Sequence, residues 1–223
     1  MLPLAERLRP RTLNDYIGQK HLVGQDAVIR QMIEQHNLRS FILWGPPGVG
    51  KTTLAKIIAH ELECPFYTLS AVTSGVKEVR EVIDKAKRDA AIHGGLFADK
   101  DTQRGVSPIL FIDEIHRFSK SQQDSLLGAV EDGTVTLIGA TTRAGMLTSP
   151  LRDRFGVIQR LELYSKEQLT DIIRRSSMIL SIPCTADGAA EIYGPELGQL
   201  AYEAGVSRLV EGEAVLPEGF QLK

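Results

Sequence analysis

The chain has few cysteines, no long apolar run and no excess of basic residues, and each absence excludes a class of protein. Cys64 and Cys184 are the only cysteines among 223 residues, too few and too isolated for a disulfide framework or a zinc site. No stretch approaches the roughly 18 apolar residues of a membrane span, and the first ten residues lack the apolar segment of a signal peptide. The net charge of −2 differs from the basic footprint of a dedicated DNA-binding domain. We therefore expect a soluble, reduced, cytoplasmic protein with no membrane contact, whose DNA contacts come from a local patch or from several subunits together.

The chain does contain short apolar runs that alternate with amphipathic segments. Apolar runs predict strands at residues 40–44, 66–69, 109–112, 135–139 and 157–163. Helical spacing of apolar residues predicts helices at residues 25–35, 51–62, 76–92, 119–130 and 166–180, with Ser119 as an N-cap. Residues 94–107 are polar and contain glycine, which indicates a surface loop. The alternation predicts an α/β fold, a parallel sheet flanked by helices that binds ligands at the carboxyl ends of its strands.

A complete phosphate-loop motif follows the first predicted strand. It consists of Gly45, Pro46, Pro47, Gly48, Val49, Gly50, Lys51 and Thr52. The glycines let backbone N–H groups turn toward phosphate oxygens, and the helix that starts near Lys51 adds the positive end of its dipole. We predict that Lys51 reaches the β- and γ-phosphates of ATP, that Thr52 ligates Mg²⁺, and that Thr53 belongs to the nucleotide-binding set. The alternative, an ordinary glycine-rich turn, is disfavoured because a strand and a helix flank the loop.

Acidic and hydroxyl residues follow two further predicted strands. Asp113 ends the run ILFI and is suited to hold Mg²⁺ through water, while Glu114 can polarise the attacking water. Thr142 lies shortly after the predicted strand 135–139. A hydroxyl at this strand end can form a hydrogen bond with the γ-phosphate or with the attacking water. Thr141 is the alternative residue for that role. A further alternative is that both threonines belong to an ordinary turn at the end of the strand. His116 follows the acidic pair, and we predict a structural or surface role for it.

An arginine-rich segment, SPLRDRF, occupies residues 149–155. Phosphoryl transfer spreads negative charge over the γ-phosphoryl oxygens, and a guanidinium supplied from outside the pocket can stabilise that charge. The alternative is a surface cluster of arginine and aspartate held by ion pairs. The residues alone do not decide between a finger that acts on a phosphate and a surface cluster of ion pairs.

Together these segments resemble the AAA+ ATPases. Residues 45–52 resemble Walker A, residues 109–114 resemble Walker B, and Thr142 resembles sensor 1. The segment SPLRDRF resembles that family's arginine-finger segment, in which Arg154 matches the finger position better than Arg152. The resemblance implies a finger that acts on the ATP of a neighbouring subunit, and hence a homo-oligomeric ring.

Within the AAA+ proteins, two families share the resemblance. Residues 1–142 resemble the replication-associated recombination protein RarA, through LAERLRPRTLNDYIGQKHLVG, FILWGPPGVGKTTLAKIIA and the stretch that contains ILFIDEIHRF. Residues 143–190 resemble RuvB, the Holliday-junction motor, through TTRAGMLTSPLRDRFGVIQRLELY. Both resemblances imply adenine contacts from the segment before the first strand and, for RuvB, from a tyrosine after the last one. The residues concerned are Leu8, Arg9, Tyr16, Ile17 and Tyr164.

Two departures from these families bear on function. Residues 131–134 turn directly into the next strand, whereas RuvB carries a longer segment with a partner-docking hairpin there. Neither family's lid-arginine motif, GTPR or GDAR, occurs after Glu191. Taken together with the resemblance, the sequence predicts four segments. They are a nucleotide-contacting extended arm (1–24), an AAA+ ATPase core (25–164), a partial helical lid (165–192) and a tail of undetermined fold (193–223). Within the tail, a helix is expected at 197–204.

These features predict an ATP-binding and ATP-hydrolysing protein that acts on DNA in replication, recombination or repair. The expected DNA is forked, single-stranded or a junction, and replication or recombination proteins are the expected further partners. One alternative is RuvB-like branch migration of a Holliday junction. Another is a nucleotide-binding interaction module with weak hydrolysis, because the lid is incomplete.

Overall fold

The computed structural model describes residues 3–95, 107–131, 133, 135–155, 157–185, 188–189, 209–210 and 213–214. The chain forms two compact units, one made of Arg11–Leu163 and the other of Met1–Pro10 with Tyr164–Lys223. Most of the loop predicted at 94–107 and the whole helix predicted at 197–204 lie outside the described residues. Gly94 and Gly95 are described, and both belong to a helix rather than to that loop.

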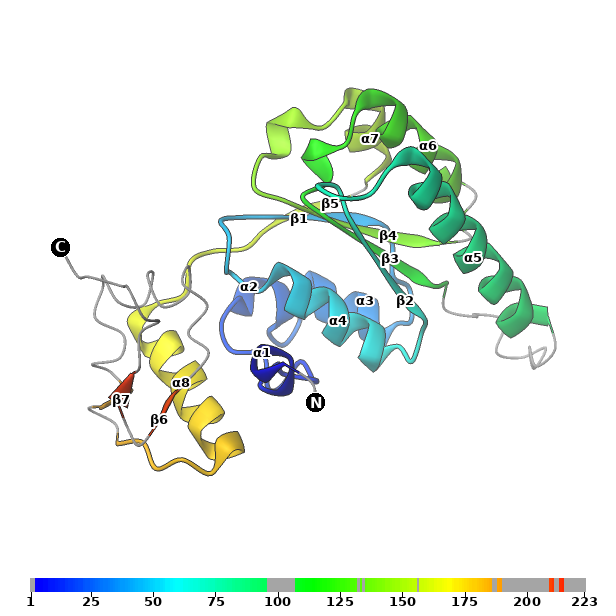
Figure 1. The fold of residues 1–223 in the computed structure, drawn as a ribbon. Coiled ribbons are helices and arrows are strands. Elements are labelled where there is room, and N and C mark those ends of the chain that lie inside the picture. The colour runs from blue at the N-terminus through cyan, green and yellow to red at the C-terminus, as the bar shows by residue number, and fades with distance from the viewer. Residues whose placement is uncertain are drawn as a thin grey trace. The chain divides into compact units, whose positions relative to one another are not determined.

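A five-stranded parallel sheet forms the centre of the larger unit (Figure 1). Its strands are β1 (Phe41–Trp44), β2 (Phe66–Ser70), β3 (Ile109–Asp113), β4 (Thr136–Thr141) and β5 (Val157–Arg160). They lie side by side in the order β2-β3-β4-β1-β5. The central place of β4 brings its carboxyl end between those of β1 and β3, and the predicted parallel sheet is thereby confirmed.

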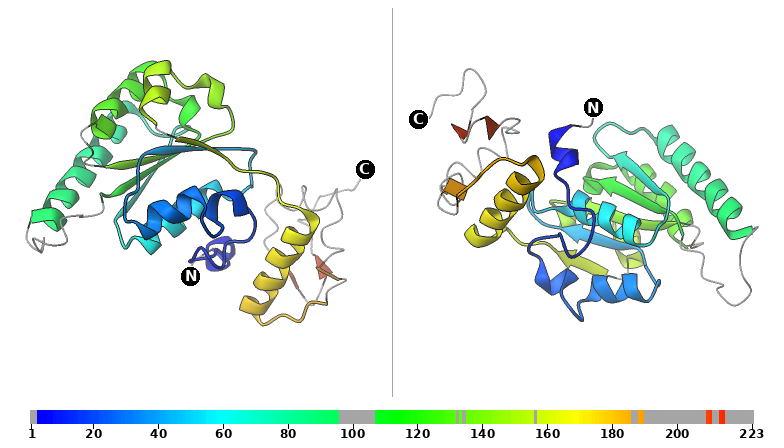
Figure 2. Two further views of the ribbon diagram at one scale, coloured as in Figure 1. Left: turned by 180° about the vertical axis from the view of Figure 1, so that it is seen from behind. Right: turned by 90° about the horizontal axis from the view of Figure 1, so that it is seen from below.

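Helices cover both faces of this sheet (Figures 1 and 2). One layer holds α2 (Lys20–Val23), α3 (Val28–Glu34) and α4 (Lys51–Glu61). The other holds α5 (Val76–Gly95), α6 (Lys120–Glu131) and α7 (Ser149–Arg154). Two single 3₁₀ turns, η1 (Ile115–Arg117) and η2 (Ala144–Met146), follow β3 and β4. Ser119 accepts a hydrogen bond from the backbone N–H of Gln122 at 3.4 Å, which agrees with its predicted N-cap position.

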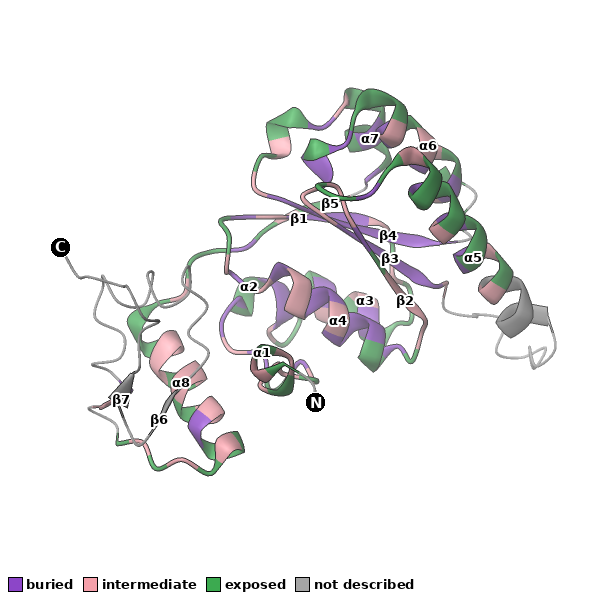
Figure 3. Ribbon diagram, in the orientation of Figure 1, coloured by how far each residue is buried: buried purple, intermediate pink, exposed green. Residues whose placement is uncertain are grey.

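The three inner strands, β1, β3 and β4, are largely buried on both sides, and their successive residues face different cores (Figure 3). Leu43, Phe111 and Ile138 belong to the core that includes the apolar side chains of α3 and α4. Ile42 and Leu110 belong to the core shared with α5, α6 and α7. Side chains alternate between the two faces of a strand. When helices cover both faces of the sheet, every residue of an inner strand is buried, and the strand is therefore an uninterrupted apolar run. This burial fixes the strands whose carboxyl ends carry the candidate site.

The N-terminal segment is not the extended arm that we predicted, since it contains two short helices. One is α2, and the other is α1 (Leu4–Arg7), which belongs to the smaller unit. Just before α2, the Gln19 side chain is buried and bonds both backbone groups of Glu162. Its Nε2 donates to the Glu162 carbonyl at 2.7 Å, and its Oε1 accepts from the Glu162 N–H at 2.9 Å. Tertiary hydrogen bonds of this kind hold the segment in place, whereas its polar sequence indicated an extended arm with turns.

The smaller unit contains α8 (Lys166–Leu180), whose bounds match the predicted helix. Ser165 begins it with a capping box, in which its hydroxyl accepts from the Gln168 N–H and the Gln168 side chain accepts from the Ser165 N–H. Arg175 donates to the Leu8 carbonyl at 2.7 Å. A short antiparallel pair, β6 (Leu209–Val210) and β7 (Glu213–Ala214), is also described. No helix within the described part of the chain has the length and apolar character needed to cross a membrane.

Candidate active site

The phosphate loop joins β1 to α4 at the carboxyl edge of the sheet. The N–H of Gly45 donates to the carbonyl of Thr141 at the end of β4, at 3.2 Å. Gly48 and Gly50 have φ angles of 82° and 91°, which side chains with a β-carbon rarely adopt. The loop therefore depends on glycine at both positions, and it leads directly into α4, which begins at Lys51.

Lys51 is buried, with 7% of the residue exposed, and its ammonium bonds the loop itself. The Nζ atom donates to the carbonyls of Gly45 at 2.8 Å and Pro46 at 2.7 Å. Burial lowers the pKa of Lys51, and the nearby charges of Glu114 and Asp113 act in the opposite direction. The loop, the lysine and the acidic pair thus form one electrostatic group. Thr52 and Thr53 are half-buried in the first turn of α4, and Pro46 and Pro47 are exposed.

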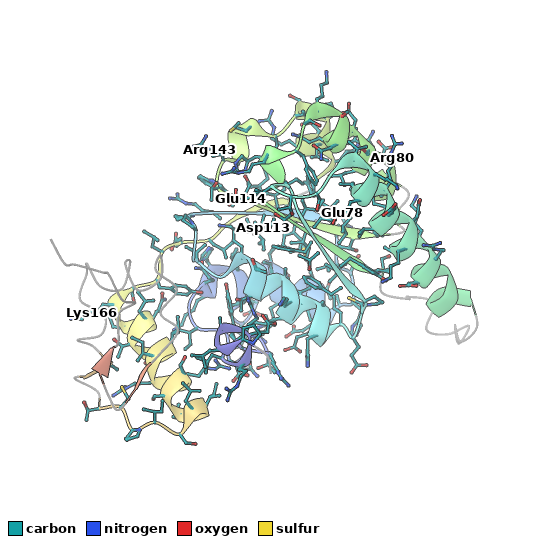
Figure 4. The ribbon with its side chains drawn as sticks, in the orientation of Figure 1. Glu78, Arg80, Asp113, Glu114, Arg143 and Lys166 are labelled. Atoms are coloured by element: carbon teal, nitrogen blue, oxygen red, sulfur yellow. The ribbon has the colours of Figure 1, made fainter. Side chains whose placement is uncertain are left out.

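Asp113 and Glu114 follow the buried part of β3, as predicted, and lie next to each other in Figure 4. Burial and the charge of Glu114 raise the pKa of Asp113, and the Glu114 N–H and the charge of Lys51 oppose that change. Glu114 itself has the left-handed backbone angles φ 50° and ψ 41°. A residue other than glycine in this region costs about 1 kcal/mol. The conformation begins η1 and sets the direction of the Glu114 side chain.

Two polar side chains, one from η1 and one from just after β4, meet the carboxylate of Glu114. Thr142 donates its hydroxyl hydrogen to Glu114 Oε2 at 3.1 Å. His116 Nδ1 lies 3.1 Å from the same oxygen and 2.9 Å from the hydroxyl of Thr141. Burial lowers the pKa of His116, Glu114 raises it, and Arg117 and Arg143 lower it. His116, for which a structural or surface role was expected, is buried and contacts Glu114.

An open hollow of about 600 Å³ lies beside this group. Its lining combines apolar, imidazole, hydroxyl and guanidinium groups at the ends of β2, β3 and β4, from Ala71, Val72, His116, Arg117, Thr142, Arg143 and Met146. Figure 4 labels Arg143 close to Glu114 and Asp113. The hollow thus presents cationic groups next to the residues that we expect to face the γ-phosphate.

The residues present fit magnesium only together with a phosphate ligand. Among the described residues, no group of three or more His, Cys, Asp and Glu side chains is placed to hold a metal ion. Mg²⁺ binds ATPases through one or two protein oxygens, with the remaining positions filled by phosphate and water. Thr52 at the start of α4 and Asp113 at the end of β3 stay the predicted pair.

The predicted adenine contacts divide between the two units. In the larger unit, the hydroxyl of Tyr16 donates to the carbonyls of Val49 at 3.4 Å and Gly50 at 3.3 Å, and Ile17 is half-buried. In the smaller unit, Arg9 pairs with Glu6 at 3.0 Å, while Leu8 and Tyr164 are half-buried. Tyr16 is thus placed against the phosphate loop, and all five adenine contacts stay predictions.

Arg154 lies at the opposite edge of the sheet from the phosphate loop. It is the last residue of α7 and comes just before β5 begins at Val157. Because all five strands are parallel, the start of β5 lies at the amino edge, about 10 Å or more from the carboxyl edge along a four-residue strand. Arg154 is exposed, and it pairs with Glu131 at 2.7 Å. The structure therefore does not bring Arg154 together with Lys51, Asp113 and Glu114 of its own chain.

Comparisons with known proteins agree with this geometry. The model of the AAA family, the ATPase family associated with various cellular activities, matches residues 41–163. The chain is 51% identical to replication-associated recombination protein A of Haemophilus influenzae over 140 residues, 63% of this chain and 29% of that protein. It is 40% identical to the protein of the same name from Escherichia coli K12 over 214 residues, 95% of this chain and 43% of that protein. The chain thus spans less than half the length of these curated relatives.

The fold is also similar to a solved structure, the RuvB Holliday junction branch migration motor of Thermotoga maritima. The TM-score is 0.67 at 32% sequence identity, and the match covers 89% of this chain and 65% of that one. Both likenesses that the sequence indicated are therefore found. The family model covers more than half of the chain, from β1 through the end of β5, and includes the phosphate loop and the acidic strand end. The chain belongs to the AAA family of ATPases.

Proposed function

We propose that this chain binds ATP with Mg²⁺ and hydrolyses it, as a subunit of an oligomeric ATPase that acts on DNA in replication-associated recombination. The observation that carries the proposal is the meeting of three strand ends. The phosphate loop after β1, Asp113 and Glu114 after β3, and Thr142 after β4 share one edge of the sheet. The names of curated relatives at 40–51% identity supply the connection to recombination.

In this proposal, the loop binds the phosphates and the acidic pair prepares the attack. Backbone N–H groups of residues 45–52 and the Lys51 ammonium hold the β- and γ-phosphates. Thr52 and Asp113 hold the Mg²⁺ that accompanies ATP, and this ion neutralises charge on the phosphate oxygens. Glu114 orients the attacking water, and Thr142 donates a hydrogen bond to the γ-phosphate or to that water.

The arginine that stabilises the transferred group comes from a neighbouring subunit. Arg154 lies at the amino edge of the sheet, whereas its own phosphate loop lies at the carboxyl edge. Its exposure makes the guanidinium available to a second copy of the chain. This placement favours a homo-oligomeric ring with shared sites, and it favours Arg154 as a finger over a purely structural role in the ion pair with Glu131.

ATP turnover, measured with and without single-stranded or forked DNA, tests the proposal. Lys51→Ala should lose nucleotide binding, while Glu114→Gln should retain binding and lose turnover. Lys77→Ala is the matched control, because the Lys77 side chain is 91% exposed on α5. Turnover that persists in Lys51→Ala and Glu114→Gln would contradict the mechanism. Tight ATP binding with negligible turnover under every condition would instead indicate a nucleotide-binding interaction module.

Branch migration is the second candidate function, and the structural likeness to the Thermotoga maritima motor favours it. A synthetic four-way junction and a synthetic fork, each incubated with the protein and ATP, separate the two candidates. Movement of the junction would support branch migration. Turnover stimulated by the fork without junction movement would support the leading proposal.

A further inference from the structure

The carboxylate of Glu114 is held through one of its two oxygens. The hydroxyl of Thr142 and Nδ1 of His116 each lie 3.1 Å from Glu114 Oε2. Within the described part of the chain, Glu114 Oε1 receives no such contact. The two oxygens therefore have different surroundings, although they are chemically equivalent in the free side chain.

We propose that His116 is a positioning residue that fixes Oε2 of Glu114 and thereby leaves Oε1 to accept a hydrogen from the attacking water. The inference deepens the proposed function and rests on it. His116 does not touch ATP in this proposal, since it acts through the Glu114 carboxylate.

The reason that Thr142 alone does not suffice is its single hydroxyl hydrogen. In the structure that hydrogen is donated to Glu114. In the proposed reaction, Thr142 donates to the γ-phosphate or to the water, and one hydroxyl hydrogen cannot serve fully in both bonds. When Thr142 turns to the phosphate, His116 remains as the donor that keeps the carboxylate in place.

The fold holds His116 firmly enough for this role. The left-handed conformation of Glu114 begins the 3₁₀ turn η1, which brings the side chain two residues later back beside the carboxylate. His116 is 8% exposed, and its Nδ1 also lies 2.9 Å from the Thr141 hydroxyl. That hydroxyl accepts the N–H of Arg143 at 3.0 Å. The imidazole is thus fixed from both β3 and β4 rather than by Glu114 alone.

This geometry specifies which ring nitrogen carries the hydrogen. A lone pair on Nδ1 facing a carboxylate oxygen at 3.1 Å would be repelled, so we place the hydrogen on Nδ1, where Glu114 Oε2 and the Thr141 hydroxyl oxygen at 2.9 Å share it. Burial lowers the pKa of His116, which favours a neutral ring. A neutral ring with its hydrogen on Nδ1 leaves Nε2 bare, and the contact with Glu114 then requires no positive charge.

Three substitutions test the role. His116→Leu fills the buried space without a donor, His116→Asn places an amide nitrogen near the position of Nδ1, and His116→Gln carries its amide farther out. We expect His116→Leu and His116→Gln to lower kcat for ATP about ten- to a hundredfold, the scale of a misplaced catalytic group. KM and ATP-analogue affinity should change by less than about twofold, because the phosphate contacts do not involve His116. His116→Asn should recover most of the lost kcat. His60→Leu, on the exposed end of α4, is the control.

Several results would overturn the inference. They are an unchanged kcat in His116→Leu, a kcat in His116→Asn as low as in His116→Leu, and a loss of ATP affinity that parallels the loss of kcat. Nitrogen-15 NMR of the histidine rings in the full chain gives a second readout that needs no turnover. We expect a hydrogen on Nδ1 of His116 at neutral pH, and this signal should change in Glu114→Gln. A hydrogen found on Nε2 alone would overturn the inference.

The two readouts also separate this inference from the proposed function. Absence of turnover in the unmodified chain would count against hydrolysis, while the NMR signal would still decide the contact between His116 and Glu114. Normal turnover with an unaffected His116→Leu variant would refute the positioning role and leave the proposed function standing.

Discussion

Gly45, the first glycine of the phosphate loop, is a position where one added methyl group should have a large and measurable effect. An ideal β-carbon at this position would lie 2.5 Å from the carbonyl oxygen of Leu161 and 3.3 Å from its carbonyl carbon. Real β-carbons essentially never approach an atom within 3.0 Å, so the backbone must move. Leu161 cannot yield easily, because its side chain is buried and its N–H donates to the Trp44 carbonyl at 2.7 Å.

Gly45→Ala should therefore destabilise the protein by about 2 kcal/mol, within the range of roughly 1–3 kcal/mol for an overpacked site. With a urea dependence of about 2 kcal/mol per molar, the unfolding midpoint should fall by about 1 M. The affinity for an ATP analogue should fall as well, because the shift displaces the loop N–H groups.

Gly128→Ala is the matched control for this experiment. Gly128 lies inside α6, and an added β-carbon there would meet no atom within 4 Å. The same glycine-to-alanine change should therefore raise stability by about 0.5–1 kcal/mol, through the better helix propensity of alanine. A Gly45→Ala midpoint within about 0.2 M of the unmodified protein, with the control behaving as expected, would refute the steric argument.

Three further changes have defined outcomes. Asp113→Asn should raise the thermal stability of the ligand-free protein at neutral pH. The pKa of the Asp113 carboxyl is raised in the folded state, so ionising this group destabilises the folded protein, and the substitution removes that penalty. That penalty grows as the pH rises from the unfolded value near 3.8 and is complete above the folded pKa, so a gain that persists below pH 3.8 would contradict the assignment. Gln19→Glu keeps the acceptor for the Glu162 N–H but removes the donor to its carbonyl, and it should cost about 1–3 kcal/mol in urea unfolding. Arg154→Ala should leave ATP-analogue binding nearly intact and reduce hydrolysis on the order of a thousandfold. Mixing that variant with Lys51→Ala should restore part of the turnover, and no restoration would exclude a shared site.

The strands and the phosphate loop could be predicted because their signals are local. An apolar run such as residues 109–112 is buried on both faces wherever helices cover the sheet, and the observed strand adds only Asp113. Strand ends were less predictable. The strand β4 continues to Thr141, beyond the predicted end at 139, because its backbone pairs with β1 as far as Trp44 opposite Thr141. The buried Thr141 hydroxyl has its own partners in His116 and the Arg143 N–H. The local sequence around Thr141 does not indicate hydrogen-bond partners that lie elsewhere in the chain.

The same reason explains what was missed around the candidate site. The contact of His116 with Glu114 depends on a left-handed residue other than glycine, and the sequence DEIH carries no glycine or asparagine that would signal it. The bond between Gln19 and Glu162 joins residues 143 positions apart, and nothing near either residue indicates it. Motifs fix which residue types are available, while packing across β3 and β4 decides which of them touch.

The hydrogen bonds of Lys51 have a consequence for ligand selectivity. Its ammonium has three hydrogens and already has two carbonyl acceptors in its own loop, so an incoming ligand that accepts more than one hydrogen competes with Gly45 and Pro46. A hydrogen bond from a cation to an anionic oxygen is roughly twice as strong as one to a neutral acceptor. An uncharged ligand therefore offers this lysine little in exchange, whereas an anionic phosphate oxygen does. The loop thus selects anionic ligands over uncharged ones, and this selection does not depend on contacts with the base or the sugar.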